Sequence, residues 1–325
     1  MVKKWTSYAF DQLGLFLLHK KKSRKSQFKP YEQCVSINTA DWDLIYPAPE
    51  IPNITFEQIN QHHNYQIGKY FFDSPLKSDY HLNDIASGLY HLNTKGHPVH
   101  VVLVHGWRMD SLNKINNLFL KPFQQAGCHM YHVTLPFHFE RSCDALYSGE
   151  YMISADLDRS VLAVRQAVTE IRALIRWIKQ NHGGKIVLIG VSLGGFISNL
   201  TAVVEDQIDL LISIMYANTL SFAVWNAPIG KYIKQDMIQN GITYPILKRH
   251  WEILEPYRKE PKVNKDNILL IAGLYDQYVL FEDSVKLWEA WNHPHLLTYP
   301  CGHSGIVLHR KKISNDVMSF ITSKI

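Results

Sequence analysis

From about residue 98 onward the chain alternates between short apolar runs and longer segments with helical periodicity, and few architectures accommodate that order. The short runs are aliphatic and β-branched without regular alternation, as expected of strands covered by helices on both faces. The predicted strands span residues 99–104, 129–134, 185–189, 210–215, 267–272 and 295–299. The predicted helices span residues 111–125, 156–180, 194–205 and 282–291. Such strand–helix–strand units predict an α/β fold with a mainly parallel sheet and helices on both faces.

Other segments flank or interrupt this pattern. Residues 65–72 and 87–93 are predicted to add two antiparallel edge strands before it. Residues 218–265 are rich in aromatic residues and prolines, and they predict a helical insertion between two strands of the sheet. An insertion at this point lies over the carboxyl ends of the strands, so it is a candidate lid and substrate-binding cap. We therefore expect an N-terminal extension over residues 1–64 and one main domain, insertion included, over residues 65–325.

The composition is that of a globular protein with one sizeable core. Among 325 residues, 46% are hydrophobic and 19% are charged, and no internal repeat or Gly/Ser-rich linker separates two domains. The cysteines are far apart and form no CxxC pair, which argues against a disulfide scaffold or a zinc site and favours a reducing, cytoplasmic compartment. The four positions are Cys34, Cys128, Cys143 and Cys301.

The N-terminal segment, residues 5–18, is rich in Leu, Phe and Trp but is interrupted by Asp11 and Gln12. It is too short and too polar to span a bilayer, and no cleavage site of a signal peptide follows it. We expect an amphipathic helix that docks on the protein, and peripheral attachment to a membrane surface through residues 5–25 is the alternative. The basic run at residues 20–25 is either a solvated segment or a segment that attracts phosphates or anionic lipid. It has no interleaved aromatic residues, so it does not predict nucleic-acid binding.

Residues 190–194 read Gly-Val-Ser-Leu-Gly, a GxSxG pentapeptide. The letters alone are weak evidence, but here they follow a predicted strand and open a predicted helix. That context is typical of a nucleophile elbow, in which a very tight turn exposes the serine oxygen and the glycines let neighbouring backbones approach closely. Ser192 is therefore the predicted nucleophile.

This context resembles the α/β-hydrolase superfamily, in particular its serine esterases and lipases. Residues 105–107, His-Gly-Trp, follow the predicted strand at residues 99–104 and look like the turn that ends the third strand of that fold. The resemblance implies that the backbone amides of Trp107 and Leu193 form the oxyanion hole. It also implies a structural role for His105 rather than that of a catalytic base.

The resemblance covers roughly residues 65–325 and also implies the general base, because the family places serine, acid and histidine in that order along the chain. The histidines that follow the acid are His293, His295, His303 and His309. The first two fall before or inside the last predicted strand, and the fourth falls at the start of the final helix. His303 lies in a glycine-flanked loop directly after that strand, so it is the predicted base.

The acid of the triad is expected in the turn after the penultimate strand. Residues 269–272 are followed there by Gly-x-x-Asp, which ends at Asp276. The family sometimes takes its acid from the turn after the preceding strand, but residues 217–235 contain no carboxylate. Asp276 is therefore the predicted acid. Asp283 ranks second, because it is expected to lie on the following helix rather than in the turn. The alternative role for Asp276 is to cap that helix.

Several other polar side chains near the predicted site carry weaker signals. His138 and Arg141 follow the strand at residues 129–134, so they either contact substrate or serve packing and solubility. Arg108 either orients an anionic group or pairs with Asp110. His129 and His132 are three residues apart on a strand and point to opposite faces, so no metal site is predicted.

The resemblance implies a serine hydrolase that cleaves a carboxylic ester or thioester through an acyl-enzyme, with a small-molecule ester or acyl substrate and without cofactor or metal. The aromatic insertion suggests an apolar acyl or alcohol group. Amidase, peptidase, lipase and acyltransferase activities use the same machinery, and a non-catalytic binding or scaffold protein of the same fold is the alternative from another class. The sequence leaves the oligomeric state open.

Overall fold

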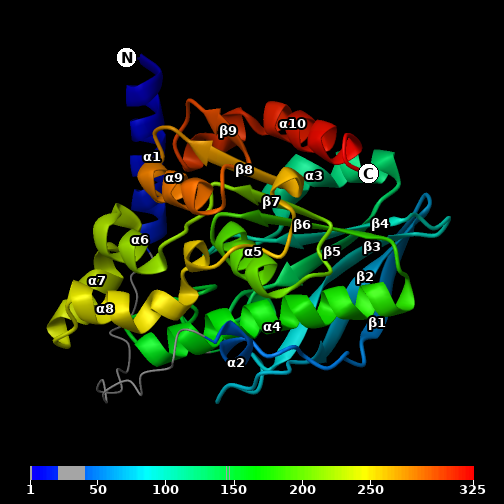
Figure 1. Cartoon of the computed structure of the whole chain (residues 1–325), viewed down its shortest axis with the longest axis horizontal. Coiled ribbons are helices and arrows are strands. Elements are labelled where there is room, and N and C mark those ends of the chain that lie inside the picture. Colours follow the sequence, from blue (N-terminus) through cyan, green and yellow to red (C-terminus); the bar gives the residue numbers. More distant parts are fainter. Residues whose placement is uncertain (1, 21–40, 144, 146) are drawn as a thin grey trace.

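The computed structural model describes residues 2–20, 41–143, 145 and 147–325 of the chain. Within these ranges a nine-stranded sheet crosses the molecule in the order β1-β2-β3-β5-β4-β6-β7-β8-β9 (Figure 1). The pairs from β1 to β5 are antiparallel, and every pair from β5 to β9 is parallel. The strands are β1 (Thr55–His62), β2 (Tyr65–Asp73), β3 (Ile85–Asn93), β4 (Val99–Val104), β5 (His129–Thr134), β6 (Lys185–Val191), β7 (Leu210–Ile214), β8 (Ile268–Gly273) and β9 (His295–Tyr299).

Helices cover both faces of the sheet. The main helices are α3 (Asn113–Ala126), α4 (Leu157–Asn181), α5 (Leu193–Val204), α9 (Phe281–Ala290) and α10 (Arg310–Thr322). Helices α3 and α10 pack on one face, and α4, α5 and α9 pack on the other (Figure 1). In β4 every residue is buried, with Val102 and Val104 in one hydrophobic cluster and Val101 and Leu103 in the other. This explains why the strand lacks polar alternation and confirms the predicted α/β fold.

The sheet begins earlier than expected. Strands β2 and β3 are antiparallel as predicted, but they are not at the edge, because β1 pairs with β2 on the outer side. Strand β1 therefore adds a strand before the predicted boundary at residue 65. Its sequence, Thr-Phe-Glu-Gln-Ile-Asn-Gln-His, is mostly polar, and nearly all of its side chains are exposed. A strand whose two faces are both solvated has no hydrophobic pattern by which it can be recognised.

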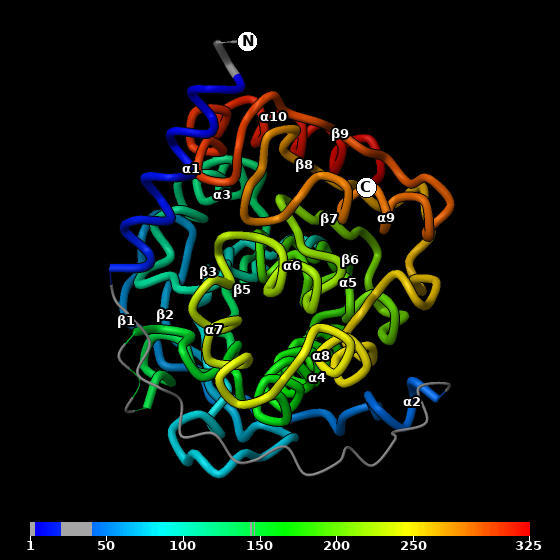
Figure 2. The backbone as a smooth tube through the Cα atoms, turned by 90° about the vertical axis from the view of Figure 1, so that its left-hand side faces the viewer, coloured from blue at the N-terminus to red at the C-terminus, as the bar shows by residue number. Residues whose placement is uncertain are grey.

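Residues 218–265 form helices between β7 and β8, at the side of the molecule that Figure 2 turns toward the viewer. Their bounds are α6 (Leu220–Asn226), α7 (Lys231–Gln239) and α8 (Tyr244–Trp251). The Trp251 side chain is fully buried and its indole nitrogen donates to the carbonyl oxygen of Leu157 at the start of α4. Part of the aromatic content of this segment therefore serves to anchor it to the body.

Helix α1 (Val2–Lys20) runs along the same side, and a short helix α2 (Trp42–Ile45) precedes β1 (Figures 1 and 2). The buried face of α1 carries Ser7, Asp11 and Leu15, which are spaced four residues apart as one face of a helix requires. Helix α1 packs against the 3₁₀ helix η6 (Ser304–Leu308), which follows β9. In the described ranges no helix combines the length and the apolar character needed to cross a membrane.

Candidate active site

The turn between β6 and α5 holds Ser192 in a strained conformation. Its backbone has φ 57° and ψ −119°, in a region that residues with a side chain rarely adopt. A Cβ atom at Gly190 would overlap the carbonyl oxygen of Gly194, and one at Gly194 would overlap the carbonyl oxygen of Val104. Only glycine fits at these two positions, so the motif lets β6 turn directly into α5 and leaves the Ser192 hydroxyl at the end of the sheet.

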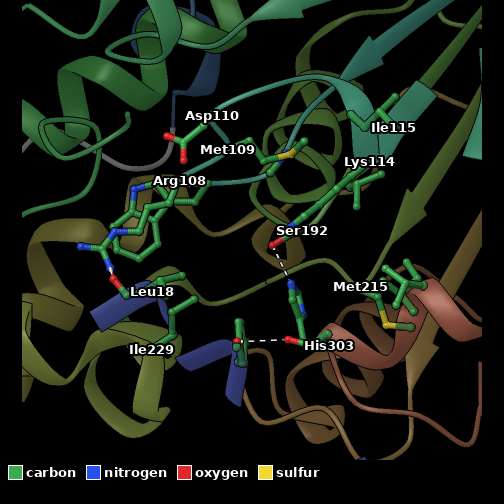
Figure 3. A pocket seen from close by; sticks show the side chains of 18 of the residues that line it. Leu18, Arg108, Met109, Asp110, Lys114, Ile115, Ser192, Met215, Ile229 and His303 are labelled. Atoms are coloured by element: carbon green, nitrogen blue, oxygen red, sulfur yellow. Dashed lines mark hydrogen bonds between the residues drawn. The ribbon is translucent and has the colours of Figure 1, made fainter. Parts of the chain in front are cut away.

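Three polar side chains from three separate loops meet at this turn. The Ser192 Oγ atom is 2.9 Å from Nε2 of His303, toward which it points in Figure 3. On the other side of the ring, Nδ1 of His303 is 2.7 Å from Oδ2 of Asp276. Ser192 follows β6, Asp276 follows β8 and His303 follows β9, so all three lie at carboxyl ends of parallel strands, where open α/β sheets bind ligands.

The hydrogen bonds assign the tautomer of His303. The Asp276 carboxylate is an acceptor, so Nδ1 carries the proton and Nε2 is left to accept the Ser192 hydroxyl proton. Burial alone lowers the pKa of His303, but the charge and hydrogen bond of Asp276, together with the charge of Asp11, outweigh it and leave that pKa above its ordinary value. The ring is therefore a stronger base than an exposed histidine.

Asp276 is fixed in orientation by the backbone that follows it. Its Oδ1 atom accepts hydrogen bonds from the amides of Tyr278 at 2.8 Å and Val279 at 2.9 Å, which leaves Oδ2 for His303. The Tyr278 ring stacks on the imidazole, with ring centroids 4.7 Å apart and 12° between the planes. Asp276 thus holds the turn that follows it and contacts the histidine, but it does not cap α9, which has Leu280 as its N-cap residue, so the capping alternative is wrong. Asp283 lies on α9 and accepts from the amides of Asn218 and Thr219 instead.

The His-Gly-Trp turn after β4 passes next to the serine. A Cβ atom at Gly106 would lie 3.2 Å from that of Ser192. His105 is fully buried, its Nδ1 donates to the carbonyl oxygen of Gly106 and its Nε2 accepts from the amide of Leu135. Burial lowers the pKa of His105 to about 4, so it is neutral and braces the turn, the structural role predicted for it. The Trp107 indole nitrogen donates to Gly149 O at 2.7 Å, which holds this side chain and its backbone in place.

A cavity of about 410 Å³ opens in front of Ser192 and His303 (Figure 3). Its apolar walls come from α3 and its preceding loop, from η6 and, unexpectedly, from helix α1, which contributes Gly14, Leu17 and Leu18. Among the described residues, the insertion over residues 218–265 supplies Ile229. The main added wall of the cavity is therefore the N-terminal helix rather than the predicted cap.

Arg108 also lines this cavity and contacts helix α1. Its Nη1 donates to the carbonyl oxygen of Leu18 at 3.1 Å, and its guanidinium lies 3.7 Å from the centre of the Tyr147 ring. Burial lowers the pKa of Arg108, although the group stays cationic at neutral pH. The side chain joins the turn after β4 to the end of α1.

The two side chains after β5 that were considered for substrate contact are interior residues. His138 is fully buried and its Nδ1 donates to the carbonyl oxygen of Pro136. Arg141 is 1% exposed and makes a bidentate ion pair with Glu170 of α4 at 2.7 and 2.8 Å. Neither side chain lines the cavity in front of Ser192, so the packing alternative holds for both, and Glu170 supplies the partner that the buried guanidinium of Arg141 needs.

The residues that form the site do not suggest a metal centre. In the ranges that the structure describes, no group of three or more His, Cys, Asp and Glu side chains is arranged to hold a metal ion. His129 lies on β5, where its ring nitrogens lie 3.1 and 3.2 Å from the backbone nitrogens of Asn93 and His97.

The fold and this arrangement define a class of protein. Residues 101–309 match the alpha/beta hydrolase family, and the chain belongs to that family. The uncharacterized protein YdjC of Bacillus subtilis (strain 168) is 51% identical over 115 residues, which make up 35% of this chain and 99% of that protein. An uncharacterized protein of Mycobacterium tuberculosis (strain H37Rv) is 28% identical over 222 residues, 65% of this chain and 51% of its own length. The chain thus spans about half the length of that relative.

Solved structures with a similar fold include enzymes. An acetyl xylan esterase from Paenibacillus sp. R4 has a TM-score of 0.66 and 13% sequence identity, over 93% of this chain and 98% of that one. An acylaminoacyl peptidase from Pyrococcus horikoshii has a TM-score of 0.60 and 16% identity, over 81% of this chain and 42% of that one. At these identities the likeness establishes the fold and leaves the substrate open.

Proposed function

We propose that this protein is a serine hydrolase that cleaves a carboxylic ester or thioester through an acyl-enzyme. The observation that carries the proposal is the continuous pair of hydrogen bonds from Ser192 through His303 to Asp276, at 2.9 and 2.7 Å, beside an apolar cavity. A serine hydroxyl is a poor nucleophile unless a base removes its proton, and the base needs a partner that fixes its tautomer. Ser192 is the nucleophile, His303 the base and Asp276 the residue that orients it.

In the proposed reaction, Ser192 Oγ attacks the acyl carbon while Nε2 of His303 takes the hydroxyl proton. The amides of Trp107 and Leu193 hold the oxyanion of the tetrahedral intermediate. Leu193 is the first residue of α5, and the amide of such a residue has no carbonyl partner within its helix. His303 then returns the proton to the leaving alcohol or thiol. Water attacks the acyl-enzyme with His303 again as base, which releases the acid and restores the Ser192 hydroxyl.

The walls of the cavity favour a small molecule with an apolar acyl group as substrate. We expect kcat/KM to rise about four-fold for each methylene added to the acyl chain until the cavity is filled, because each buried methylene contributes about 0.8 kcal/mol. The measurement is a chain-length series of chromogenic esters and thioesters. A flat series, or one that falls from acetyl onward, would assign the acyl group to another part of the surface.

A fluorophosphonate probe tests whether the protein is an enzyme at all. Covalent labelling that mass spectrometry assigns to Ser192 supports the hydrolase, whereas a folded protein that stays unlabelled supports the scaffold alternative. Amide substrates and alcohol acceptors, assayed alongside the esters, distinguish hydrolysis of esters from amidase, peptidase and acyltransferase activity. The acetyl xylan esterase and acylaminoacyl peptidase among the structural neighbours make both ester and amide substrates reasonable first choices.

The outer face of helix α1 supports a second proposal, contact with a lipid surface. Trp5, Leu13 and Phe16 are 71%, 56% and 69% exposed, and at 3.6 residues per turn they lie on the face opposite Asp11. In the sequence the helix runs directly into the basic residues 20–25, of which residues 21–25 lie outside the described ranges. An apolar helix face beside a cationic segment is the pattern of an interfacial helix. We propose that α1 binds an anionic lipid surface while the cavity opens beside it.

Co-sedimentation tests this contact. We expect the wild type to pellet with vesicles made of equal parts phosphatidylcholine and phosphatidylglycerol, and a variant with Trp5, Leu13 and Phe16 changed to glutamine to stay in the supernatant. The matched control changes three exposed apolar residues elsewhere, Leu44, Ile59 and Leu82, to glutamine and is expected to pellet like the wild type. Equal pelleting of the two variants contradicts the proposal. Gel filtration gives a second test. If the wild type is a dimer and only the α1 variant is a monomer, a second copy of the chain covers this face, and the proposal is contradicted.

A further inference from the structure

Helix α1 brings a buried carboxylate to the loops of the candidate active site. Asp11 is 0% exposed although it lies in the middle of an N-terminal helix. Its Oδ2 accepts hydrogen bonds from the amide of His303 at 3.0 Å and from the amide of Gln277 at 3.1 Å, and its Oδ1 accepts from the amide of Ser304 at 2.8 Å. One side chain therefore joins the backbone next to Asp276 to the backbone of His303 itself.

The surrounding residues are shaped around this contact. A Cβ atom at Gly302 would overlap the carboxylate oxygens of Asp11, so a glycine is needed there for the loop to approach the helix. The Tyr278 hydroxyl, whose ring stacks on His303, donates to the carbonyl oxygen of Asp11. A Cβ atom at Gly14, one turn further along α1, would overlap that same hydroxyl. The helix, the loop after β8 and the loop after β9 are fitted to one another at this point.

A helix that merely docks on a surface has no need of a carboxylate at its centre. Burying a charge is costly unless hydrogen bonds compensate it, and an apolar side chain would bury the same face without that cost. Here the carboxylate is also close enough to Asp276 for repulsion, and burial with this repulsion raises the pKa of Asp11 in spite of the three amides. A carboxylate kept at such a position indicates a role for its acceptor atoms.

We propose that Asp11 is a positioning residue, which ties the His303 loop to the Asp276 loop and so holds the imidazole in reach of Ser192. Helix α1 is then a part of the catalytic centre, to which it also contributes cavity wall. The inference rests on the proposed serine hydrolase function. It predicts that loss of the Asp11 carboxylate lowers turnover although the triad itself is intact.

Asp11 also acts on His303 through its charge, which gives a readout that a purely structural role lacks. The groups that face the imidazole are Asp276 from the loop after β8, Asp11 from α1, Lys114 from the start of α3, and the neutral Tyr278 ring. Both carboxylates raise the pKa of His303, and Lys114 lowers it. His303 must be neutral to accept a proton, so the acidic limb of the pH profile of kcat/KM follows its pKa. Removal of the Asp11 charge should move this limb to lower pH.

The test compares Asp11→Asn with wild type and with the control Gln12→Ala on a chromogenic ester. Asparagine keeps the size of the side chain but offers one acceptor oxygen for three amides. We expect kcat to fall about 10- to 100-fold, as for a small misplacement of a catalytic group, with KM changed little and with the acidic limb at lower pH. Gln12 is exposed and donates to the side chain of Gln277 at the surface, so its substitution should leave kcat and the limb unchanged. Rates are normalised to the sites that a fluorophosphonate titrates.

Gly302→Ala supplies a second variant, in case Asp11→Asn does not fold. It pushes the loop away from Asp11 without removing a charge, so kcat should fall while the acidic limb moves less than in Asp11→Asn. A folded Asp11→Asn protein with the wild-type kcat and limb overturns the inference, as does a loss that is the same at every pH without a shift. Wild-type activity in Gly302→Ala overturns it as well. A wild type that the probe never labels at Ser192 instead removes the proposed function.

Discussion

Ser192→Ala is expected to abolish ester hydrolysis, with kcat reduced by about a million-fold toward the uncatalysed rate. Alanine keeps the backbone of the elbow, and its smaller side chain fits wherever the serine fits, so the fold and the cavity should survive. What is lost is the oxygen that forms the acyl-enzyme, and His303 then has no hydroxyl proton to accept. The measurement is kcat on the best ester of the chain-length series, together with labelling by the fluorophosphonate probe.

Ser198→Ala is the matched control for this prediction, because it makes the same change in helix α5, which directly follows Ser192. Ser198 is fully buried in α5 and lies away from the cavity, so the variant should keep wild-type turnover and labelling. If Ser192→Ala retained wild-type turnover, the acyl group would be transferred by another residue or by water directly. The acyl-enzyme mechanism would then have to be abandoned.

The parts of the fold that could be predicted are those in which local pattern and tertiary environment agree. Strands β4 and β6 are buried on both faces and read as continuous apolar runs, and α4 carries one apolar stripe along its whole length. The GxSxG turn could also be predicted, because Gly190 and Gly194 meet steric limits that no other residue satisfies. The positions of Asp276 and His303 came from family resemblance, and their catalytic roles stay predictions.

The contributions that were missed depend on partners far away in the sequence. Asp11 appears in the sequence as a polar interruption of an apolar segment, and its partners, among them the amide of Ser304, are almost the whole chain away. Arg141 looks like a surface residue until Glu170 is found beside it. No periodicity encodes such pairs. Asp11 lies four residues before Leu15, on the same buried face of α1. A charge on a helix face that should be apolar was the signal in the sequence that could have pointed to its role.

Asp276→Asn is expected to lower kcat by about 10⁴-fold while the triad keeps its positions. The reason lies in the backbone amides of Tyr278 and Val279, which donate to Oδ1 of Asp276. They require a hydrogen-bond acceptor at that position, which in asparagine is the amide oxygen. The asparagine must therefore turn its NH₂ group toward Nδ1 of His303. A donor at that position makes Nδ1 an acceptor and moves the ring proton to Nε2, where it faces the Ser192 hydroxyl and cannot remove its proton.

The control for this last variant is Asp283→Asn, on the neighbouring helix α9. Asp283 is likewise a buried carboxylate that accepts from two backbone amides, but it has no contact with His303, so its substitution should cost stability and leave kcat per folded protein unchanged. Loss of the Asp276 charge should also move the acidic limb of kcat/KM to lower pH, because that charge raises the pKa of His303. If kcat of Asp276→Asn stayed within ten-fold of the wild-type kcat, losing the carboxylate would cost at most about 1.4 kcal/mol of transition-state stabilisation. Another group would then have to orient the imidazole. Asp11, which holds the same loop by its backbone, would then be the first residue to substitute in that background.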